Sequence, residues 1–423
     1  MKIFVLNCGS SSFKFQIFDM DNGRNRLLVK GLCANLCGDE TKSELTIAVI
    51  DENGEKVEGK NIKSQPRPMA DHSAAIKTVI DAVTGKSEGG LYKVIDSLDE
   101  ITAVGHRVLH GGEKFSGSVL VDDKVEEAIK ECFDLGPLHN PANLMGIEVC
   151  EKLMPGIPQV AVFDTGFHST MPDYSYLYNL PYEYYEKYGI RRYGFHGTSH
   201  RYVSMRCLDL LGNPEHSKII TCHLGNGSSI SAIVDGKCLD TTMGLTPLEG
   251  IMMGTRCGSI DPAIIPFIMK TEKEKYKDMS VEEIANDLDN LMNKKSGMLG
   301  LTGDTADNVT IEKRAKAGDE RAILVEAMLC HQLNKYIGGF AAAMGGVDAV
   351  VFTGGIGENN PQYRTRVAEK IGFLGTEIDE DANHVRGKEI EISKPGSKVK
   401  MFVIPTDEEL MIAMDTKAIA FGK

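Results

Sequence analysis

Two similar hairpin signatures, one at the start of the chain and one near its middle, constrain the fold more than any other feature. In the first, the apolar run 3–6 leads through a turn of Asn, Gly and Ser into the alternating segment 13–18. In the second, the apolar segment 219–224 leads through a similar turn into 230–234. A strand, a small polar turn and a second strand form the pattern of a β-hairpin. Because each hairpin opens one half of the chain, the sequence predicts a duplicated domain.

Helical periodicity and short apolar runs fill the rest of the chain. The sequence predicts helices over 142–153, 320–343 and 407–420. A fourth helix is predicted between the cap Thr198-Ser199 and Gly212. A fifth is predicted to run from the capping box of Ser280 and Glu283 to Gly297. The predicted buried strands are 160–163, 350–352 and 402–404, each followed by polar residues. With 423 residues, the chain is long enough for two domains. We expect two α/β domains around a cleft, 1–164 and 165–406, with the C-terminal helix of 407–423 on the first domain.

Charge and cysteine usage exclude several classes of function. The formal net charge of −13 disfavours binding to nucleic acid or to an anionic membrane surface. The nearest cysteines, Cys33 and Cys37, lack the C-x-x-C spacing of zinc or redox sites. No stretch reaches the ~20 apolar residues that cross a bilayer, and Met1-Lys2 leads straight into a strand without a signal peptide. We therefore expect a cytoplasmic protein with reduced thiols and no nucleic-acid or membrane partner.

Glycine-rich turns at three places predict contacts with phosphate groups. Small residues let backbone N–H groups approach an anion and adopt positive φ. A single turn of this kind is as often a simple chain reversal as a phosphate-binding site. Two such turns that face each other from duplicated domains could bind a polyphosphate. The third turn, 354–359, joins a strand to a helix, where the sugar and α-phosphate of a nucleotide commonly bind. A tight strand–helix turn is the alternative there.

Two glycine-flanked arginines and two carboxylates form the candidate reaction centre. Arg107 and Arg256 suit a reaction between an anionic nucleophile and a phosphoryl group, and a structural ion pair is the alternative. Asp164 and Glu408 each follow an apolar strand, where a carboxylate holds Mg²⁺ or caps a helix. His196 is interpreted as a hydrogen-bond donor to a phosphoryl oxygen. Zinc is disfavoured because no cysteine or acidic residue completes a ligand set at familiar spacing.

Eight sequence blocks, in this order, resemble the acetate kinase family, which belongs to the acetate and sugar kinase/Hsp70/actin superfamily. The blocks are N-x-G-S-S-S-x-K at 7–14, H-R-V-x-H-G-G at 106–112, P-L-H-N-P at 137–141, F-D-T-x-F-H at 163–168, Y-G-F-H-G-T-S-H at 193–200, H-L-G-N-G at 223–227, G-G-I-G-E-N at 354–359 and T-D-E-E at 406–409. The resemblance covers essentially the whole chain. It implies an α/β fold of two duplicated actin-like (ribonuclease H-like) domains around a nucleotide cleft.

The resemblance also implies an activity and a set of site residues. The activity is reversible transfer of the ATP γ-phosphoryl group to acetate, with Mg²⁺ or Mn²⁺, in a homodimer. Catalytic positions are matched by Asp164, Arg107, Arg256 and His196, and metal positions by Asn7 and Glu408. Nucleotide positions are matched by Lys14, His223, Leu224, Gly225, Asn226, Gly227, Asp307, Gly355, Ile356, Gly357, Glu358 and Asn359. The acetate site is matched by Arg107, Leu109, Leu138, Phe195 and Pro247. Because acetate is already ionised near pH 7, we expect Asp164 to orient other groups rather than to remove a proton.

Departures from the family pattern leave alternatives open. Cys257 and Ser259 replace a Ser and an Asp after Arg256, which removes a candidate orienting partner of that arginine. Val309 stands where an arginine usually contacts the nucleotide, so GTP or pyrophosphate stays open as donor. Leu109, in place of a common Val, narrows the acyl pocket by about a methylene, and propionate or butyrate stays open as acceptor. An actin- or Hsp70-like ATPase clamp is the alternative in a different class.

Overall fold

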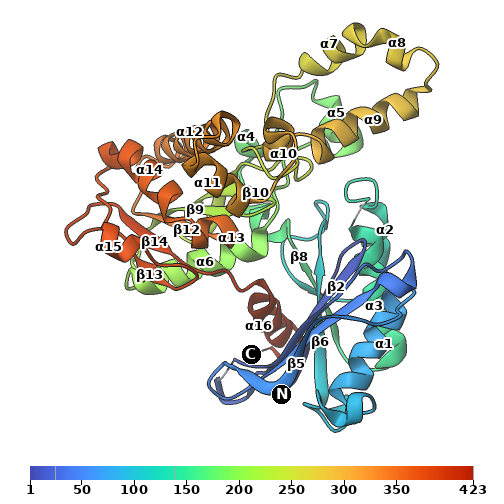
Figure 1. Cartoon of the computed structure of the whole chain (residues 1–423). Coiled ribbons are helices and arrows are strands. Elements are labelled where there is room, and N and C mark those ends of the chain that lie inside the picture. Colours follow the sequence, from blue (N-terminus) through green and yellow to red (C-terminus); the bar gives the residue numbers. More distant parts are fainter. Residues whose placement is uncertain (24, 138, 423) are drawn as a thin grey trace. The chain divides into compact units, whose positions relative to one another are not determined.

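The computed structural model describes residues 1–23, 25–137 and 139–422 (Figure 1). They form two compact units. The first unit comprises Met1–Ser169 and the segment that begins at Asp407, and the second comprises Thr170–Thr406. Among the helices of the described ranges, none is long and apolar enough to cross a membrane.

The first unit contains an eight-stranded sheet in the order β5-β4-β3-β2-β1-β6-β8-β7. The strands are β1 (Lys2–Cys8), β2 (Ser12–Asp19), β3 (Arg26–Ala34), β4 (Glu44–Ile50), β5 (Lys56–Pro66), β6 (Ile101–Val108), β7 (Val119–Leu120) and β8 (Gln159–Phe163). The strands from β1 to β5 form an antiparallel meander, whereas β1, β6 and β8 are parallel. The carboxyl ends of the three parallel strands therefore lie at the same edge of the sheet.

Helices cover both faces of this sheet. They are α1 (His72–Val83), α2 (Asp123–Glu131), α3 (Asn140–Leu153) and α16 (Glu408–Phe421). Phe4 and Leu6 of β1 belong to the core under α1, whereas Ile3 and Val5 pack with Ile412 of α16. Successive side chains of a strand point to opposite faces, so β1 is buried on both sides. Burial on both faces explains its continuous apolar sequence.

The second unit repeats this arrangement in a six-stranded sheet of order β11-β10-β9-β12-β14-β13. The strands are β9 (Lys218–Leu224), β10 (Ser228–Val234), β11 (Lys237–Thr241), β12 (Ala349–Thr353), β13 (Ile390–Glu391) and β14 (Lys400–Val403). An antiparallel meander of three strands is followed by the parallel strands β12 and β14. The first unit has the same order in β3-β2-β1-β6-β8, so the topology confirms the predicted duplication.

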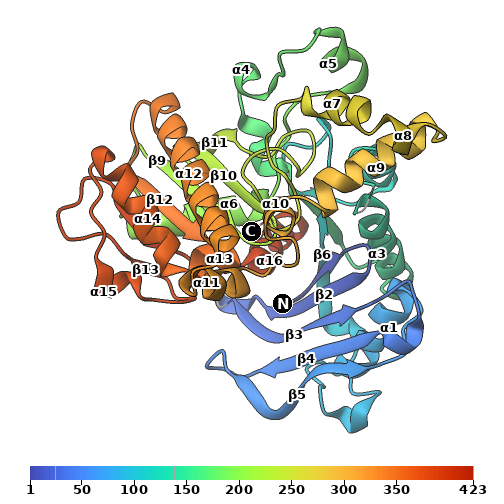
Figure 2. The ribbon, with the colours of Figure 1, turned by 45° about the horizontal axis from the view of Figure 1, so that its top comes forward.

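The helices of the second unit are α4 (Asp173–Tyr176), α5 (Glu183–Tyr188), α6 (Gly197–Leu210), α7 (Ile264–Thr271), α8 (Lys273–Tyr276), α9 (Val281–Lys294), α10 (Gly297–Thr302), α11 (Asn308–Lys316), α12 (Glu320–Ala343), α13 (Gly354–Asn359), α14 (Pro361–Ile371) and α15 (Glu380–Asn383). Some of these helices cover the two faces of the sheet of this unit, whereas α7, α8 and α9 extend away from it (Figure 1). The long helix α12 contacts β9 and β10 of the sheet, and it also contacts α11 and α14 (Figure 2). On the other face, α6 contacts β9 and β12.

Local sequence signals predict most of these elements and fail at three of them. Both hairpins are confirmed, and so is the capping box of Ser280 and Glu283. Thr198 and Ser199 do not cap α6 but lie in its first turn, because the helix begins two residues after Phe195, at Gly197. Gly297 does not end α9, which ends at Lys294, but begins α10. The glycine turn 354–359 is itself the short helix α13.

Candidate functional site

A buried ion pair lies at the carboxyl ends of the parallel strands of the first unit. Arg107 on β6 donates from Nε to Asp164 Oδ1 at 3.0 Å and from Nη2 to Asp164 Oδ2 at 2.6 Å. The two meet because β6 and β8 are neighbours, and the Asp164 side chain is only 1% exposed. Burial by itself lowers the pKa of Arg107, but the ion pair with Asp164 raises it above its ordinary value. The guanidinium is therefore charged and held in one orientation.

Oxygen donors beside this pair fit a small divalent cation. Asn7 Oδ1 accepts from Arg107 Nη1 at 3.2 Å, and Glu408 is the first residue of α16, which Asp407 caps. Burial raises the pKa of Glu408 to about 7. The positive charge of Arg107 opposes this shift, and the negative charge of Asp164 adds to it. Arg107 thus compensates a second negative charge beside Asp164 only in part. A carboxylate and an amide oxygen match Mg²⁺, which takes few protein ligands. No cluster of three His, Cys, Asp or Glu side chains suited to a metal occurs in the described ranges.

Of two other predicted residues of the first unit, one lines a depression and one is part of the core. Lys14 lies on β2, paired with Asn7 of β1, and lines a depression of about 300 Å³ together with Lys30 and Lys56. Leu109 is buried, and its backbone N–H donates to Asn143 Oδ1 at 3.0 Å. The predicted acyl-pocket residue at position 138 lies outside the described residues. The roles of these three residues stay predictions.

In the second unit, the turn between β9 and β10 lies against an imidazole and a guanidinium. A Cβ atom placed on Gly227 would lie 3.3 Å from His196 Nε2 and 3.6 Å from Arg256 Nη1. His196 has the left-handed φ of 57°, its ring stacks on His223 with centroids 4.3 Å apart, and its Nδ1 hydrogen-bonds to Ser229 Oγ at 2.9 Å. A strained backbone of this kind is typical of functional sites. The structure thus places His196 and Arg256 beside the predicted phosphate-binding turn.

Arg256 is oriented by neutral groups. Its Nη1 donates to the Pro247 carbonyl oxygen at 3.2 Å, and the Met253 thioether lies 3.9 Å away. Across the described ranges of the chain, Arg256 forms no ion pair, and burial alone shifts its pKa, which it lowers. Ser259, which replaces the Asp of the family pattern, instead exchanges two hydrogen bonds with the backbone of Gly250.

A depression of about 390 Å³ brings together half of the predicted nucleotide residues. Its lining includes Gly225, Asn226, Asp307, Gly355, Ile356 and Asn359. The predicted residues that are not part of the lining are Lys14, His223, Leu224, Gly227, Gly357 and Glu358. Leu224 is fully buried, and Glu358 instead accepts hydrogen bonds from the backbone of Gly354 (2.8 Å) and Thr406 (3.3 Å). Glu358 therefore binds the backbone at the start of its own helix, α13, and the backbone of the segment before α16.

The same depression contains residues that sequence reasoning missed. Arg386 lines it and donates from Nη1 to the carbonyl oxygen of Asn359, and Asn308, Glu312 and Asn360 line it as well. Val309, where the family pattern has an arginine, is 55% exposed in this lining. Arg386 comes from the segment after α15, where only an Arg-Gly dipeptide marks it in the sequence. The cation of this depression therefore comes from a different segment than the family pattern predicts.

Comparison with known proteins shows the family of the chain. The model of the acetokinase family matches residues 2–414. The chain belongs to the acetokinase family. Among acetokinase relatives, an acetate kinase of Treponema denticola is 52% identical over 99% of this chain and 100% of its own length. An acetate kinase of Halothermothrix orenii is also 52% identical, over 99% of each chain.

Solved acetokinase structures have the same fold. The crystal structure of Porphyromonas gingivalis acetate kinase is 46% identical, with a TM-score of 0.87 over 99% of both chains. A propionate kinase from Francisella tularensis is 39% identical, with a TM-score of 0.85 over 99% of both chains. The predicted family and the actin-like fold of two domains are confirmed.

Proposed function

We propose that this protein transfers the γ-phosphoryl group of ATP reversibly to acetate, giving acetyl phosphate and ADP. The observation that carries the proposal is the identity of 52% with curated acetate kinases over 99% of the chain. The geometry agrees with it, because each unit has an arginine next to a group that the family pattern assigns to phosphoryl transfer. Arg107 lies beside Asn7, and Arg256 lies beside the glycine turn of β9 and β10.

The reaction requires groups that orient the substrates and compensate the charge of the phosphoryl group, and it does not require a general base. An acetate oxygen attacks the γ-phosphorus in line, the bond to the β-phosphate oxygen breaks, and ADP leaves with that electron pair. Acetate needs no deprotonation near pH 7, and both oxygens of Asp164 already accept from Arg107. Asp164 therefore acts by orienting Arg107, whose remaining N–H groups bind the acetate or phosphoryl oxygens.

Arg256 and His196 compensate the charge of the transferred phosphoryl group in this proposal. Both side chains lie against Gly227, where the absence of a Cβ leaves room for an anionic ligand. The lowered pKa of buried Arg256 means that an anion would relieve an unfavourable charge. The adenosine portion is assigned to the depression lined by Asp307, Ile356 and Asn359.

Asn7 and Glu408 are the residues that would hold Mg²⁺, and Mn²⁺ fits the same oxygen donors. When bound, the metal supplies positive charge that offsets the phosphate oxygens. The raised pKa of Glu408 supports this assignment, since a neighbouring cation is what a buried carboxylate next to Asp164 requires.

Propionate is the second candidate acceptor. The observation that favours it is the 39% identity to the propionate kinase from Francisella tularensis over 99% of both chains. We assign the acyl methyl group to Leu109, Phe195 and Pro247, of which Phe195 is fully buried. One methylene changes the free energy of binding by only ~1–3 kcal/mol, so we expect slow turnover of propionate beside acetate.

We further propose that the protein acts as a cytoplasmic homodimer, with domains 1–164 plus 407–423 and 165–406. The second unit supports dimerisation because it exposes large aromatic side chains. Tyr174 is 79% exposed, Tyr182 59%, Tyr188 65% and Phe267 67%. Aromatic residues are enriched in the buried centres of protein interfaces.

Acyl phosphate formation, trapped with hydroxylamine, tests the proposed function. Mg-ATP is combined with acetate, propionate, butyrate or no acid, and GTP or pyrophosphate replaces ATP in parallel reactions. We expect product with ATP and acetate. Product only with another donor would assign Val309 to a changed nucleotide site, and product mainly with propionate would favour the second candidate. Steady phosphate release without any acid would instead indicate an ATPase clamp.

A further inference from the structure

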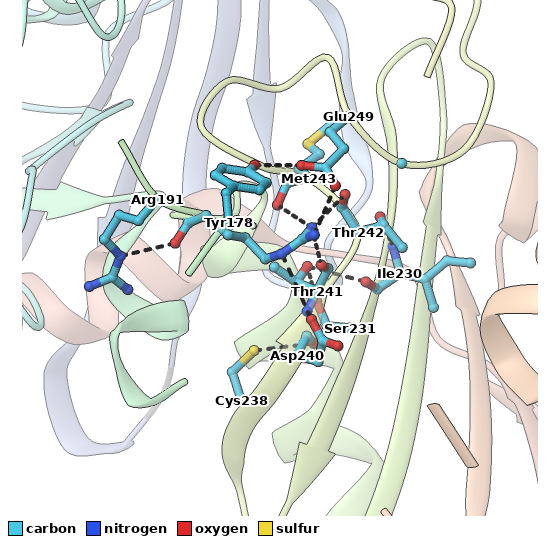
Figure 3. A network of polar contacts seen from close by, with 12 residues as sticks. Tyr178, Arg191, Ile230, Ser231, Cys238, Asp240, Thr241, Thr242, Met243 and Glu249 are labelled. Atoms are coloured by element: carbon cyan, nitrogen blue, oxygen red, sulfur yellow. Dashed lines mark hydrogen bonds and ion pairs between the residues drawn. The ribbon is translucent and has the colours of Figure 1, made fainter. Parts of the chain in front are cut away.

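A hydrogen-bonded network in the second unit includes Tyr178 and Glu249 (Figure 3), and Glu249 belongs to the loop 242–250 that carries Pro247. Tyr178 Oη donates to Glu249 Oε2 at 2.5 Å, and Arg192 Nη2 donates to Glu249 Oε1 at 2.8 Å. Figure 3 shows the Tyr178 phenol and the Glu249 carboxylate directed at each other beside Met243. Both oxygens of Glu249 are therefore used by charged or phenolic donors, which form the stronger kinds of hydrogen bond.

Two of these side chains, Arg192 and Tyr178, also bind the backbone of the loop. Arg192 Nη1 donates to the carbonyl oxygens of Thr241 at 2.8 Å and Thr242 at 3.0 Å. The backbone N–H of Leu245 donates to Tyr178 Oη at 3.0 Å. The beginning and the middle of the loop are thus connected to Tyr178 and Arg192, and Glu249 connects its end to both.

The loop closes on itself with little free space. A Cβ atom on Gly250 would lie 2.8 Å from Thr242 Cβ, and one on Gly244 would overlap both Glu249 and Tyr178. Gly250 has φ of 110°, a conformation that favours glycine. A shift of the network would therefore move the segment 242–250 as a whole, including Pro247.

The position of Pro247 affects the orientation of the Arg256 side chain through a hydrogen bond. Its carbonyl oxygen accepts from Arg256 Nη1 at 3.2 Å, and no carboxylate in the described ranges forms an ion pair with Arg256. The direction of the guanidinium consequently depends on where the loop places one carbonyl oxygen. By contrast, Asp164 orients Arg107 directly.

We propose that Tyr178, Arg192 and Glu249 are positioning residues that set the place of Arg256 and of the acyl-pocket residue Pro247 through the loop 242–250. The inference rests on the proposed function for its kinetic consequences. Loss of the network lowers turnover and changes the preference between acetate and propionate, while the nucleotide depression, which contains no residue of this loop, keeps its affinity for ATP.

Tyr178→Phe is the first variant, because it removes the hydroxyl group and retains the ring. Tyr276→Phe is its matched control, since Tyr276 Oη also donates to a carboxylate, Asp287, at 3.0 Å in the same unit. We expect kcat with acetate to fall about tenfold in Tyr178→Phe, as loss of a hydrogen bond to a charged group predicts. KM for ATP should stay within about twofold, and the acetate-to-propionate ratio of kcat/KM should change by about threefold or more. Tyr276→Phe should resemble the wild type.

A double-mutant cycle separates positioning from a general structural effect. If Tyr178 acts through Arg256, Tyr178→Phe should cause no further loss of kcat in an Arg256→Ala background. Multiplicative losses would overturn the proposal, and so would a Tyr178→Phe enzyme that is indistinguishable from Tyr276→Phe. Glu249→Gln, which retains an acceptor for Arg192, should lie between the wild type and Glu249→Ala.

Hydrogen exchange tests the inference independently of the reaction. We expect faster exchange in peptides covering 242–250 in Tyr178→Phe than in the wild type, with unchanged exchange in α12. If the wild-type protein forms no acyl phosphate, the proposed function fails, and faster exchange still supports the control of this loop by the network. Unchanged exchange in 242–250 would contradict the positioning role even in an active enzyme.

Discussion

Arg107 in the first unit and Arg256 in the second occupy similar sequence contexts, yet different kinds of group orient them. Asp164, 1% exposed, binds Arg107 through two oxygens. Arg256 has the Pro247 carbonyl oxygen and the Met253 thioether as neighbours, both of them neutral. A carboxylate therefore fixes the orientation of Arg107, whereas the positive charge of Arg256 is not offset by a carboxylate and can interact with an anionic ligand.

This difference shows that an arginine side chain can be oriented toward an anionic ligand in two ways. A carboxylate partner fixes the direction of the guanidinium but offsets part of its charge, and it is itself a buried charge that needs compensation. A carbonyl partner leaves the charge intact but fixes the direction only as well as the backbone is fixed. The first arrangement should therefore matter for stability as well as activity, and the second mainly for activity.

The largest expected effect is on turnover and should be common to both arginines. Arg107→Ala and Arg256→Ala should each lower kcat by ~10³–10⁵, because charge compensation dominates phosphoryl transfer. Arg206→Ala is the control, since Arg206 forms a similar ion pair with Glu389 on the surface. The measurement is acyl phosphate formation at saturating substrates. If kcat fell by less than about tenfold for either variant, that arginine would not be a catalytic residue.

Stability should separate the two arginines. Arg107→Met leaves Asp164 buried without a partner and should lower the free energy of unfolding by about 3–5 kcal/mol. Arg256→Met removes no ion pair and should change that free energy by less than about 1 kcal/mol. Urea unfolding of both variants measures the difference, and Arg107→Met/Asp164→Leu should regain most of the loss. Equal destabilisation by the two single variants would refute the contrast.

The residue next to Arg107 should make the first unit sensitive to acid. His106 is buried, its Nε2 hydrogen-bonds to Gln159 Oε1 at 2.7 Å, and burial lowers its pKa to about 4. Because the unfolded chain binds this proton near pH 6.5, the free energy of unfolding should fall between pH 6.5 and 4, by up to about 3 kcal/mol. Urea unfolding at several pH values should show a shallower decline in His106→Asn. Parallel pH profiles of the two proteins would contradict this origin.

The smallest expected effect concerns Arg386, the arginine that lines the nucleotide depression. Arg386 and Val309 line the same depression, so Arg386→Ala should raise KM for ATP by about fivefold and Val309→Arg should lower it by about as much. KM for acetate should not change in either variant, and Val309→Leu serves as the control for size. Steady-state kinetics with varied ATP gives the answer. A change in KM for acetate instead would place Arg386 outside the nucleotide site.

Sequence reasoning succeeded where a local pattern is sufficient and failed where partners come from distant segments. The Ser280 capping box and the two hairpins follow from neighbouring residues and were predicted correctly. Thr198 and Ser199 carry the same local signal as a cap, but the left-handed backbone of His196 begins α6 earlier. Arg386 was missed because only the folded chain brings it to Asn359.

The sequence by itself determined the family, the duplicated hairpins and the residue types at the reaction centre, because these depend on short blocks and their order. Only the tertiary structure decided which groups meet. Arg107 and Asp164 are 57 positions apart and pair because β6 and β8 are adjacent. Tyr178 and Glu249, 71 positions apart, meet around one loop. Such contacts depend on strand order and on the burial of polar groups that must find partners inside the protein, which local sequence does not encode.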